Sequence, residues 1–152
     1  MLNFFWVNLV FFNFIRKLQR FNMFELHPTL SKDTIFIKDL KLCQLLLMNN
    51  SRYPWLILVP KKAGMVELTD LNREEQNLLM AEIDFVSKKM QQIFNPDKLN
   101  TAALGNMVSQ LHIHIIARYK TDPTFPKPVW VDSENTPYEA NQLKEILSKL
   151  IA

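Results

Sequence analysis

The feature that most constrains the fold is a long amphipathic segment, residues 72–94. Apolar residues recur there at steps of four and three and form one stripe on a helix: Leu79, Ile83, Val86, Met90 and Ile93. Asn72 can cap this helix, and Glu75 three positions later completes a capping-box pattern. A helix with a single apolar face needs a surface to cover, and we expect this one to pack on a β-sheet.

Short β-favouring runs lie on both sides of this helix. Three precede it at close spacing (residues 34–37, 40–48 and 55–59) and suggest an antiparallel meander, and two follow it (99–101 and 107–117). Residues 121–137 contain four prolines and are expected to form an irregular loop. The capping pattern that runs from Thr136 to Glu139 then predicts a short amphipathic helix at the C-terminus.

The first 22 residues differ from the rest of the chain. They hold six of the eleven phenylalanines, and their apolar run of 14 residues would span about 21 Å as a helix, less than the roughly 30 Å of a bilayer core. Three interpretations stay open: an extension upstream of a start at Met23, an interfacial membrane anchor, or an arm that packs on the domain or on a partner subunit. Residues 23–152 are predicted to form a single domain.

Composition excludes several classes of site and partner. The single cysteine, Cys43, excludes a disulfide framework and a Cys-rich zinc site, and two glycines are too few for a Walker A loop or a dinucleotide-binding turn. The net charge of +3 comes from three basic residues before Met23, since the remaining 130 residues carry 15 bases and 15 acids. No nucleic-acid partner is therefore expected, and a membrane only through residues 1–22. We expect a cytoplasmic protein.

Two of the three histidines lie in a segment that alternates strictly between polar and apolar residues. On a strand, Gln110, His112, His114 and Ile116 would share one face, with the imidazoles roughly 7 Å apart. That spacing suits a phosphate group. Neutral imidazole is a good nucleophile near pH 7, because its reference pKa is about 6.5, and its attack on phosphorus would give a covalent intermediate.

Two other interpretations of this histidine pair stay open. His-x-His on a strand is a common half of a metal site, whose third ligand would have to be His27, Cys43 or a carboxylate. The two rings could also be structural histidines. Gly105, seven residues before His112, favours a ligand site, because glycine lets the backbone approach a ligand closely.

With these residues in place, the sequence resembles the histidine-triad (HIT) family of nucleotide hydrolases and transferases. The family motif is His-φ-His-φ-His-φ-φ, where φ is apolar, and this chain reads Gln110-Leu-His112-Ile-His114-Ile-Ile116. Two upstream segments, residues 45–49 and 55–62, are similar to the family's ribose-contact strand and the strand after it. The resemblance covers roughly residues 24–130 and is strongest to a bacterial-type branch. It implies an α+β fold: an antiparallel sheet of about five strands, one long packed helix and a short C-terminal helix.

The resemblance also implies a role for each matching residue. His112 would be the nucleophile that takes up the nucleotidyl group, and His114 would bind phosphate oxygens. The residues implied to bind substrate are Asn49 at the ribose, Gly105 and Asn106 in the phosphate-facing loop, and Trp130 at the edge of the cleft. No metal ligand is implied in the protein, and no cofactor beyond a divalent cation that accompanies the nucleotide.

The implied activity is hydrolysis of a nucleoside phosphate through a nucleotidyl-histidine intermediate. Candidate substrates are a dinucleoside polyphosphate, such as diadenosine tetraphosphate, or an adenosine phosphoramidate. The alternatives are a nucleotidyltransferase and a nucleotide-binding protein with little turnover. The implied partners are a small-molecule nucleotide and a second copy of the chain in a homodimer.

The chain departs from the family pattern at two positions. Gln110 replaces the first motif histidine; it can orient a neighbour through hydrogen bonds but cannot carry a titrating proton. If that position supports the nucleophile electrostatically, we expect a slower enzyme or a different pH profile; if it only positions the backbone and the ring, little should change. Met107 stands where some relatives place a hydroxyl that donates to the leaving group.

Overall fold

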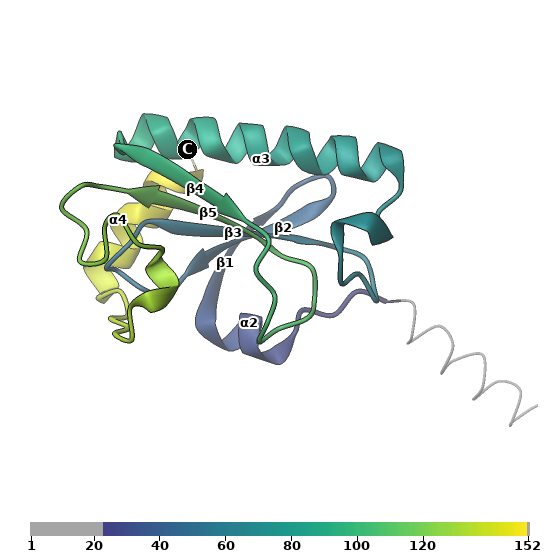
Figure 1. The fold of residues 1–152 in the computed structure, drawn as a ribbon, viewed down its shortest axis with the longest axis horizontal. Helices are drawn as coiled ribbons and strands as arrows, with labels where there is room; N and C mark the ends of the chain where they lie inside the picture. Colours follow the sequence, from purple (N-terminus) through teal and green to yellow (C-terminus); the bar gives the residue numbers. More distant parts are fainter. Residues whose placement is uncertain (1–22, 152) are drawn as a thin grey trace, which may run out of the picture.

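Alternating apolar residues build one antiparallel sheet of five strands. The computed structural model describes residues 23–151, in which the strands lie side by side in the order β1-β2-β3-β5-β4 (Figure 1). The strands are β1 (Thr34–Asp39), β2 (Cys43–Met48), β3 (Trp55–Pro60), β4 (Lys98–Ala102) and β5 (Ile113–Arg118). The α+β fold with a five-stranded antiparallel sheet is thus confirmed. The interpretations of residues 1–22 lie outside the described residues.

Helices cover both faces of this sheet. The long helix α3 (Arg73–Phe94) lies across one face and α2 (Pro28–Asp33) on the other, while α4 (Ala140–Ile151) packs on the α3 side (Figure 1). Asn72 and Glu75 form the predicted capping box at the start of α3 through reciprocal hydrogen bonds of 2.9 Å. Among residues 23–151, no helix is both long and apolar enough to cross a bilayer.

The strict alternation of β5 divides its side chains between two hydrophobic cores. Ile113 and Ile115 pack beneath α3 with Cys43 of β2, on what we call the α3 face. Ile116 packs on the opposite face, with Trp55 of β3. His114 lies on this second face, which we call the histidine face. The alternation read from the sequence therefore predicted correctly which residues the sheet presents to each side.

Several predicted boundaries were wrong for local reasons. β2 begins at Cys43 rather than at residue 40, because the N–H of Leu40 bonds to the Cys43 carbonyl and closes a turn. β5 begins at Ile113 rather than at residue 107, so His112 directly precedes the strand. Helix α2 was not predicted; its N-cap is His27, whose Nδ1 accepts a hydrogen bond from the Thr29 N–H at 3.2 Å.

The capping pattern at Thr136 does not start the C-terminal helix. The Thr136 N–H bonds to the side chain of Asn50, and the Tyr138 N–H bonds to the side chain of Asn49. These contacts hold the segment extended across the end of β2. The helix starts only at Ala140, after Glu139.

One buried carboxylate joins α3 to the sheet. Glu82 accepts hydrogen bonds from the backbone N–H groups of Leu42 and Cys43, at 2.7 and 3.0 Å. All three residues are buried. Without this carboxylate, two buried N–H groups at the start of β2 would have no partner in the structure, which is costly in an apolar environment.

We predict that Glu82→Ala lowers the free energy of unfolding by about 2–5 kcal/mol, because each unpaired buried N–H costs about 1–3 kcal/mol. Urea-induced unfolding followed by circular dichroism measures this change. The control is Asp84→Asn, which alters an exposed ion pair with Lys88 and should change stability by less than about 0.5 kcal/mol. Equal stabilities for the two variants would contradict this role of Glu82.

Candidate active site

The imidazoles of His112 and His114 lie against each other on the histidine face. Their ring centroids are 4.6 Å apart and the rings are nearly perpendicular, with an interplanar angle of 80°. Residues two apart along a strand are roughly 7 Å apart at the backbone, so the two side chains converge. Both residues are buried, with exposed fractions of 5% and 4%.

A backbone carbonyl sets the orientation of the His112 ring. Nδ1 of His112 lies 2.6 Å from the carbonyl oxygen of Gln110. A carbonyl oxygen can only accept a hydrogen bond, so Nδ1 carries the hydrogen. In the neutral ring, Nε2 then carries the free lone pair, which is the arrangement that a nucleophilic imidazole requires.

His114 is held in the opposite tautomer by a tryptophan. The indole Nε1–H of Trp55 can only donate, and it lies 3.0 Å from Nδ1 of His114. The hydrogen of the neutral ring is therefore on Nε2, which faces the Leu104 carbonyl at 3.5 Å. That contact is long for a hydrogen bond, so the Nε2–H remains available to a second acceptor such as a phosphate oxygen.

Burial keeps the His114 ring neutral. Desolvation is the main cause that lowers the pKa of His114 to about 4, and the nearby His112 lowers it further. The Leu104 carbonyl acts in the opposite direction. Since this pKa lies well below 7, His114 acts at neutral pH as an uncharged hydrogen-bond donor.

Trp130 completes an aromatic enclosure around His114. It lies in the short 3₁₀ helix η2 (Val129–Val131), and its ring stands edge-on to His114 at 5.2 Å and to Trp55 at 5.7 Å. The neighbouring Val129 is buried on the histidine face. The structure thus places Trp130 beside the histidine pair.

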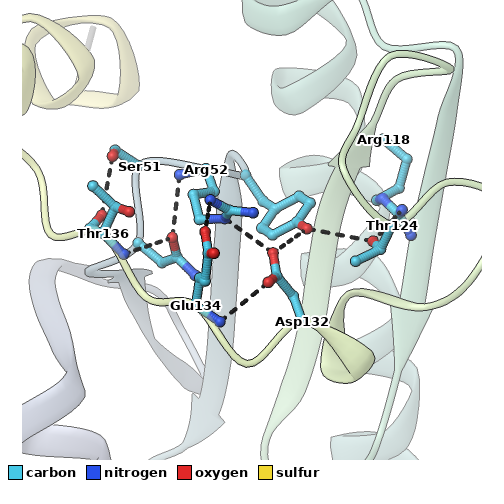
Figure 2. Close-up of polar contacts among 9 residues, drawn as sticks. Ser51, Arg52, Arg118, Thr124, Asp132, Glu134 and Thr136 are labelled. Carbon is cyan, nitrogen blue, oxygen red and sulfur yellow. Dashed lines mark hydrogen bonds and ion pairs between the residues drawn. The ribbon is translucent and has the colours of Figure 1, made fainter.

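A polar network ties the loop that carries Trp130 to the start of β3. Arg52 and the hydroxyl of Tyr53 donate to the Asp132 carboxylate at 2.9 and 2.6 Å. Figure 2 shows Asp132 beside Arg52. The Tyr53 hydroxyl also lies 3.3 Å from that of Thr124, which accepts from the buried Arg118. Two anchors therefore hold the loop, one on each side of Trp130.

The backbone before β5 opens a cleft in front of His112. This histidine cleft has a volume of about 280 Å³ and is lined by Val66, Glu67, Ala103, Gly105, Asn106, Ser109, Gln110, Leu111 and His112. A Cβ atom at Gly105 would lie only 2.8 Å from the Val108 carbonyl oxygen, so only glycine fits this turn. Gly105 and Asn106 are therefore brought to the same cleft as His112.

Family comparison agrees with this geometry. A model of the HIT domain matches residues 29–121, which is more than half of the chain. The chain belongs to the HIT family. Two of the similar solved structures are histidine triad proteins from Bradyrhizobium japonicum and Marinobacter aquaeolei VT8. Each is 44% identical with a TM-score of 0.82; the alignments cover 84% of this chain and 96% and 93% of those chains.

A third solved structure is a histidine triad protein from Sinorhizobium meliloti 1021. It is 38% identical with a TM-score of 0.82, over 84% of this chain and 95% of that one. None of the curated proteins compared with the chain matches it. The alignments cover nearly the whole length of these three proteins, and they confirm the fold that the motif predicted.

The Gln110 side chain of this HIT domain forms its hydrogen bonds away from the His112 ring. Its amide donates to the Glu25 carbonyl and accepts from the His27 N–H, both at 2.9 Å. Only its backbone carbonyl reaches His112. The effect of Gln110 on the rate and on the pH profile stays a prediction.

Two of the remaining candidates lie apart from the histidine pair. Asn49, beyond the end of β2, accepts a hydrogen bond from the Tyr138 N–H. The strand register places Asn49 level with the C-terminal end of β5, whereas His112 precedes the N-terminal end of that strand. Cys43, one of the third metal ligands considered, is buried on the α3 face, away from the histidines. Within residues 23–151, no three His, Cys, Asp or Glu side chains form a cluster that could hold a metal ion.

Three residues of the site were not predicted from the sequence: Trp55, Glu67 and Ser109. Trp55 looks like an ordinary core residue of a strand, and its contact with His114 follows only from the register in which Trp55 faces Ile116. Glu67 lies in the loop before α3 and Ser109 before β5, and both line the histidine cleft. Polar loop residues carry no periodic signal, so nothing in the pattern could place them at the cleft.

We predict that Trp130→Ala raises the pKa of His114 from about 4 towards the reference value of about 6.5, because loss of the indole exposes the ring to water. An NMR titration of the histidine ring signals measures this pKa, with His114→Asn to assign the resonance. Val131→Ala, at the exposed neighbouring position, is the control and should leave the pKa low. An unchanged His114 pKa in the Trp130 variant would show that the enclosure does not depend on this residue.

Proposed function

We propose that this HIT-family protein is a nucleotide hydrolase that works through a nucleotidyl-His112 intermediate. The observation that carries the proposal is the bond between His112 Nδ1 and the Gln110 carbonyl, in a ring that lines an open cleft. This bond leaves Nε2 as the nitrogen able to attack. A structural histidine would need neither the cleft nor this tautomer.

In the first step, the Nε2 lone pair attacks phosphorus and forms a P–N bond. The bond to the leaving group breaks, and its electron pair departs with that group. The positive charge that develops on the imidazole is stabilised by the Nδ1–H bond to the Gln110 carbonyl. In the second step, water attacks phosphorus and releases a proton to the solvent, while the P–N bond breaks and its electron pair returns to Nε2.

The surrounding residues would bind the phosphoryl group. His114 can donate from Nε2–H without carrying a charge, and Asn106 offers an amide in the cleft. The fixed turn at Gly105 allows a close approach of the backbone, and Trp130 borders the histidine pair. The substrate classes remain a dinucleoside polyphosphate or an adenosine phosphoramidate. No resident cofactor is proposed, and a divalent cation would enter only with the nucleotide.

The proposal also covers the location and the oligomeric state of the protein. We place the protein in the cytoplasm and propose that it acts as a homodimer. The edge strand β4 offers a row of backbone groups to a second chain. Beside it lies an apolar cleft of about 370 Å³ lined by residues of α3 and β4, among them Met80 and Ile83. Such an edge next to an apolar groove suits pairing between two copies.

The second candidate function is nucleotide binding with little turnover, which is favoured by Gln110 in place of the first motif histidine. A transferase would share the first chemical step and differ only in the acceptor of the second. The structure provides the orienting contact to His112 through a backbone atom, which a glutamine supplies as well as a histidine does. We therefore rank hydrolysis first.

We predict that His112→Asn lowers kcat at least about 1000-fold while nucleotide affinity changes only a few-fold, because the nucleophile is lost and the cleft is kept. The wild-type protein is incubated with radiolabelled diadenosine tetraphosphate or adenosine phosphoramidate and quenched in base. Mass spectrometry should map the adduct to His112. Turnover that persists in the variant would rule out this nucleophile, and binding without turnover in the wild type would favour the second candidate.

A further inference from the structure

The histidine cleft has an acidic side chain in its lining. Glu67 lines the cleft together with His112, and no Lys or Arg is among its lining residues in the described part of the chain. Asp70 accepts hydrogen bonds from the backbone N–H groups of Val66 and Glu67, two of the lining residues, at 2.9 and 2.8 Å. A second carboxylate therefore holds the backbone that carries Glu67.

A second cleft continues from the first. It has a volume of about 290 Å³ and shares Val66, Ser109 and Gln110 with the histidine cleft. Its other lining residues include Glu25 and His27, and again no Lys or Arg of the described residues. A group bonded to phosphorus at His112 can therefore extend past Ser109 into a space where, among the described lining residues, Glu25 is the carboxylate.

This pattern is unlike a polyphosphate site. A chain of phosphates carries several negative charges, and proteins usually bind it with Lys, Arg, backbone N–H groups or a metal ion. The proposed function nonetheless places a phosphoryl group in this cleft, because the buried His112 lines it and the Nδ1 contact leaves Nε2 as the attacking nitrogen. The negative charges of Glu67 and Glu25 would therefore act on the leaving group that is bonded to the phosphoryl group.

We propose that Glu67, with Glu25 beyond it, selects the leaving group by charge, so that this enzyme cleaves a phosphoramidate, whose leaving group is an amine, in preference to a polyphosphate. The inference rests on the proposed function, since it needs the attack by His112. It assigns a specificity role to two residues that take no part in the covalent chemistry.

The preference follows from the charge that develops in the transition state. Before Nε2 attacks a phosphoramidate, the amide nitrogen of the substrate takes a proton from water, which leaves hydroxide, and this nitrogen becomes positive. The P–N bond then breaks, its electron pair stays on the nitrogen, and a neutral amine departs. Nearby carboxylates stabilise the positive nitrogen on the way to the transition state. When a phosphoric anhydride is attacked, the departing phosphate gains negative charge, and the same carboxylates raise the barrier.

The test compares two substrates that transfer the same nucleotidyl group. These are an adenosine 5′-phosphoramidate with an alkylamine leaving group and diadenosine tetraphosphate, measured at low salt with a chelator. We expect wild-type kcat/KM to be higher for the amidate. Glu67→Gln should lower the amidate-to-polyphosphate ratio about three- to tenfold, and the double variant with Glu25→Gln should lower it further.

The control is Glu145→Gln, which removes a carboxylate on α4 that lines neither cleft and should leave the ratio unchanged. Near 1 M salt the difference between wild type and Glu67→Gln should shrink, because the Debye length falls to about 3 Å. A ratio that Glu67→Gln does not lower, or a wild-type enzyme that prefers the polyphosphate, overturns the inference while a His112 adduct still supports the hydrolase. If neither substrate forms an adduct at His112, the proposed function fails and the inference fails with it.

Discussion

The arrangement of the site depends on the hydrogen bond between the Gln110 carbonyl and Nδ1 of His112. It determines which ring nitrogen has a lone pair, and it comes from the backbone, where no side-chain substitution removes it. A second bond, from Trp55 to His114, sets the neighbouring ring in the opposite tautomer. Two chemically identical side chains thereby differ at Nε2: His112 has a lone pair there, and His114 has a hydrogen.

The fold supplies these two bonds through elementary strand geometry. Alternation places both histidines on one face, and the pairing of β3 with β5 brings Trp55 diagonally across from His114. The loop before β5 bends at Gly105, so that His112 lies at the start of the strand with an open cleft before it. The polar anchors at Asp132 and Arg118 then hold Trp130 against the other side of the pair. Burial between Trp55 and Trp130 desolvates the His114 ring, which lowers the pKa of His114 and keeps this ring uncharged.

Much of this was predictable from periodic residues. The stripe of α3, its capping box and the two faces of β5 follow from spacing alone, and the structure confirms them. Contacts between distant segments were not predictable. The Thr136 pattern is a sound capping signal locally, but the side chains of Asn49 and Asn50 claim its backbone N–H groups and delay the helix to Ala140. Glu67 reaches the cleft through a loop whose course no periodicity encodes.

The most direct test of the account is the tautomeric state of the two rings in the free protein. Long-range ¹H–¹⁵N correlation spectra at neutral pH distinguish the protonated from the unprotonated nitrogen of each imidazole. We predict that His112 carries its hydrogen on Nδ1 and His114 on Nε2. A His112 ring with its hydrogen on Nε2 would have no lone pair to offer a substrate in the cleft, and it would contradict the central claim.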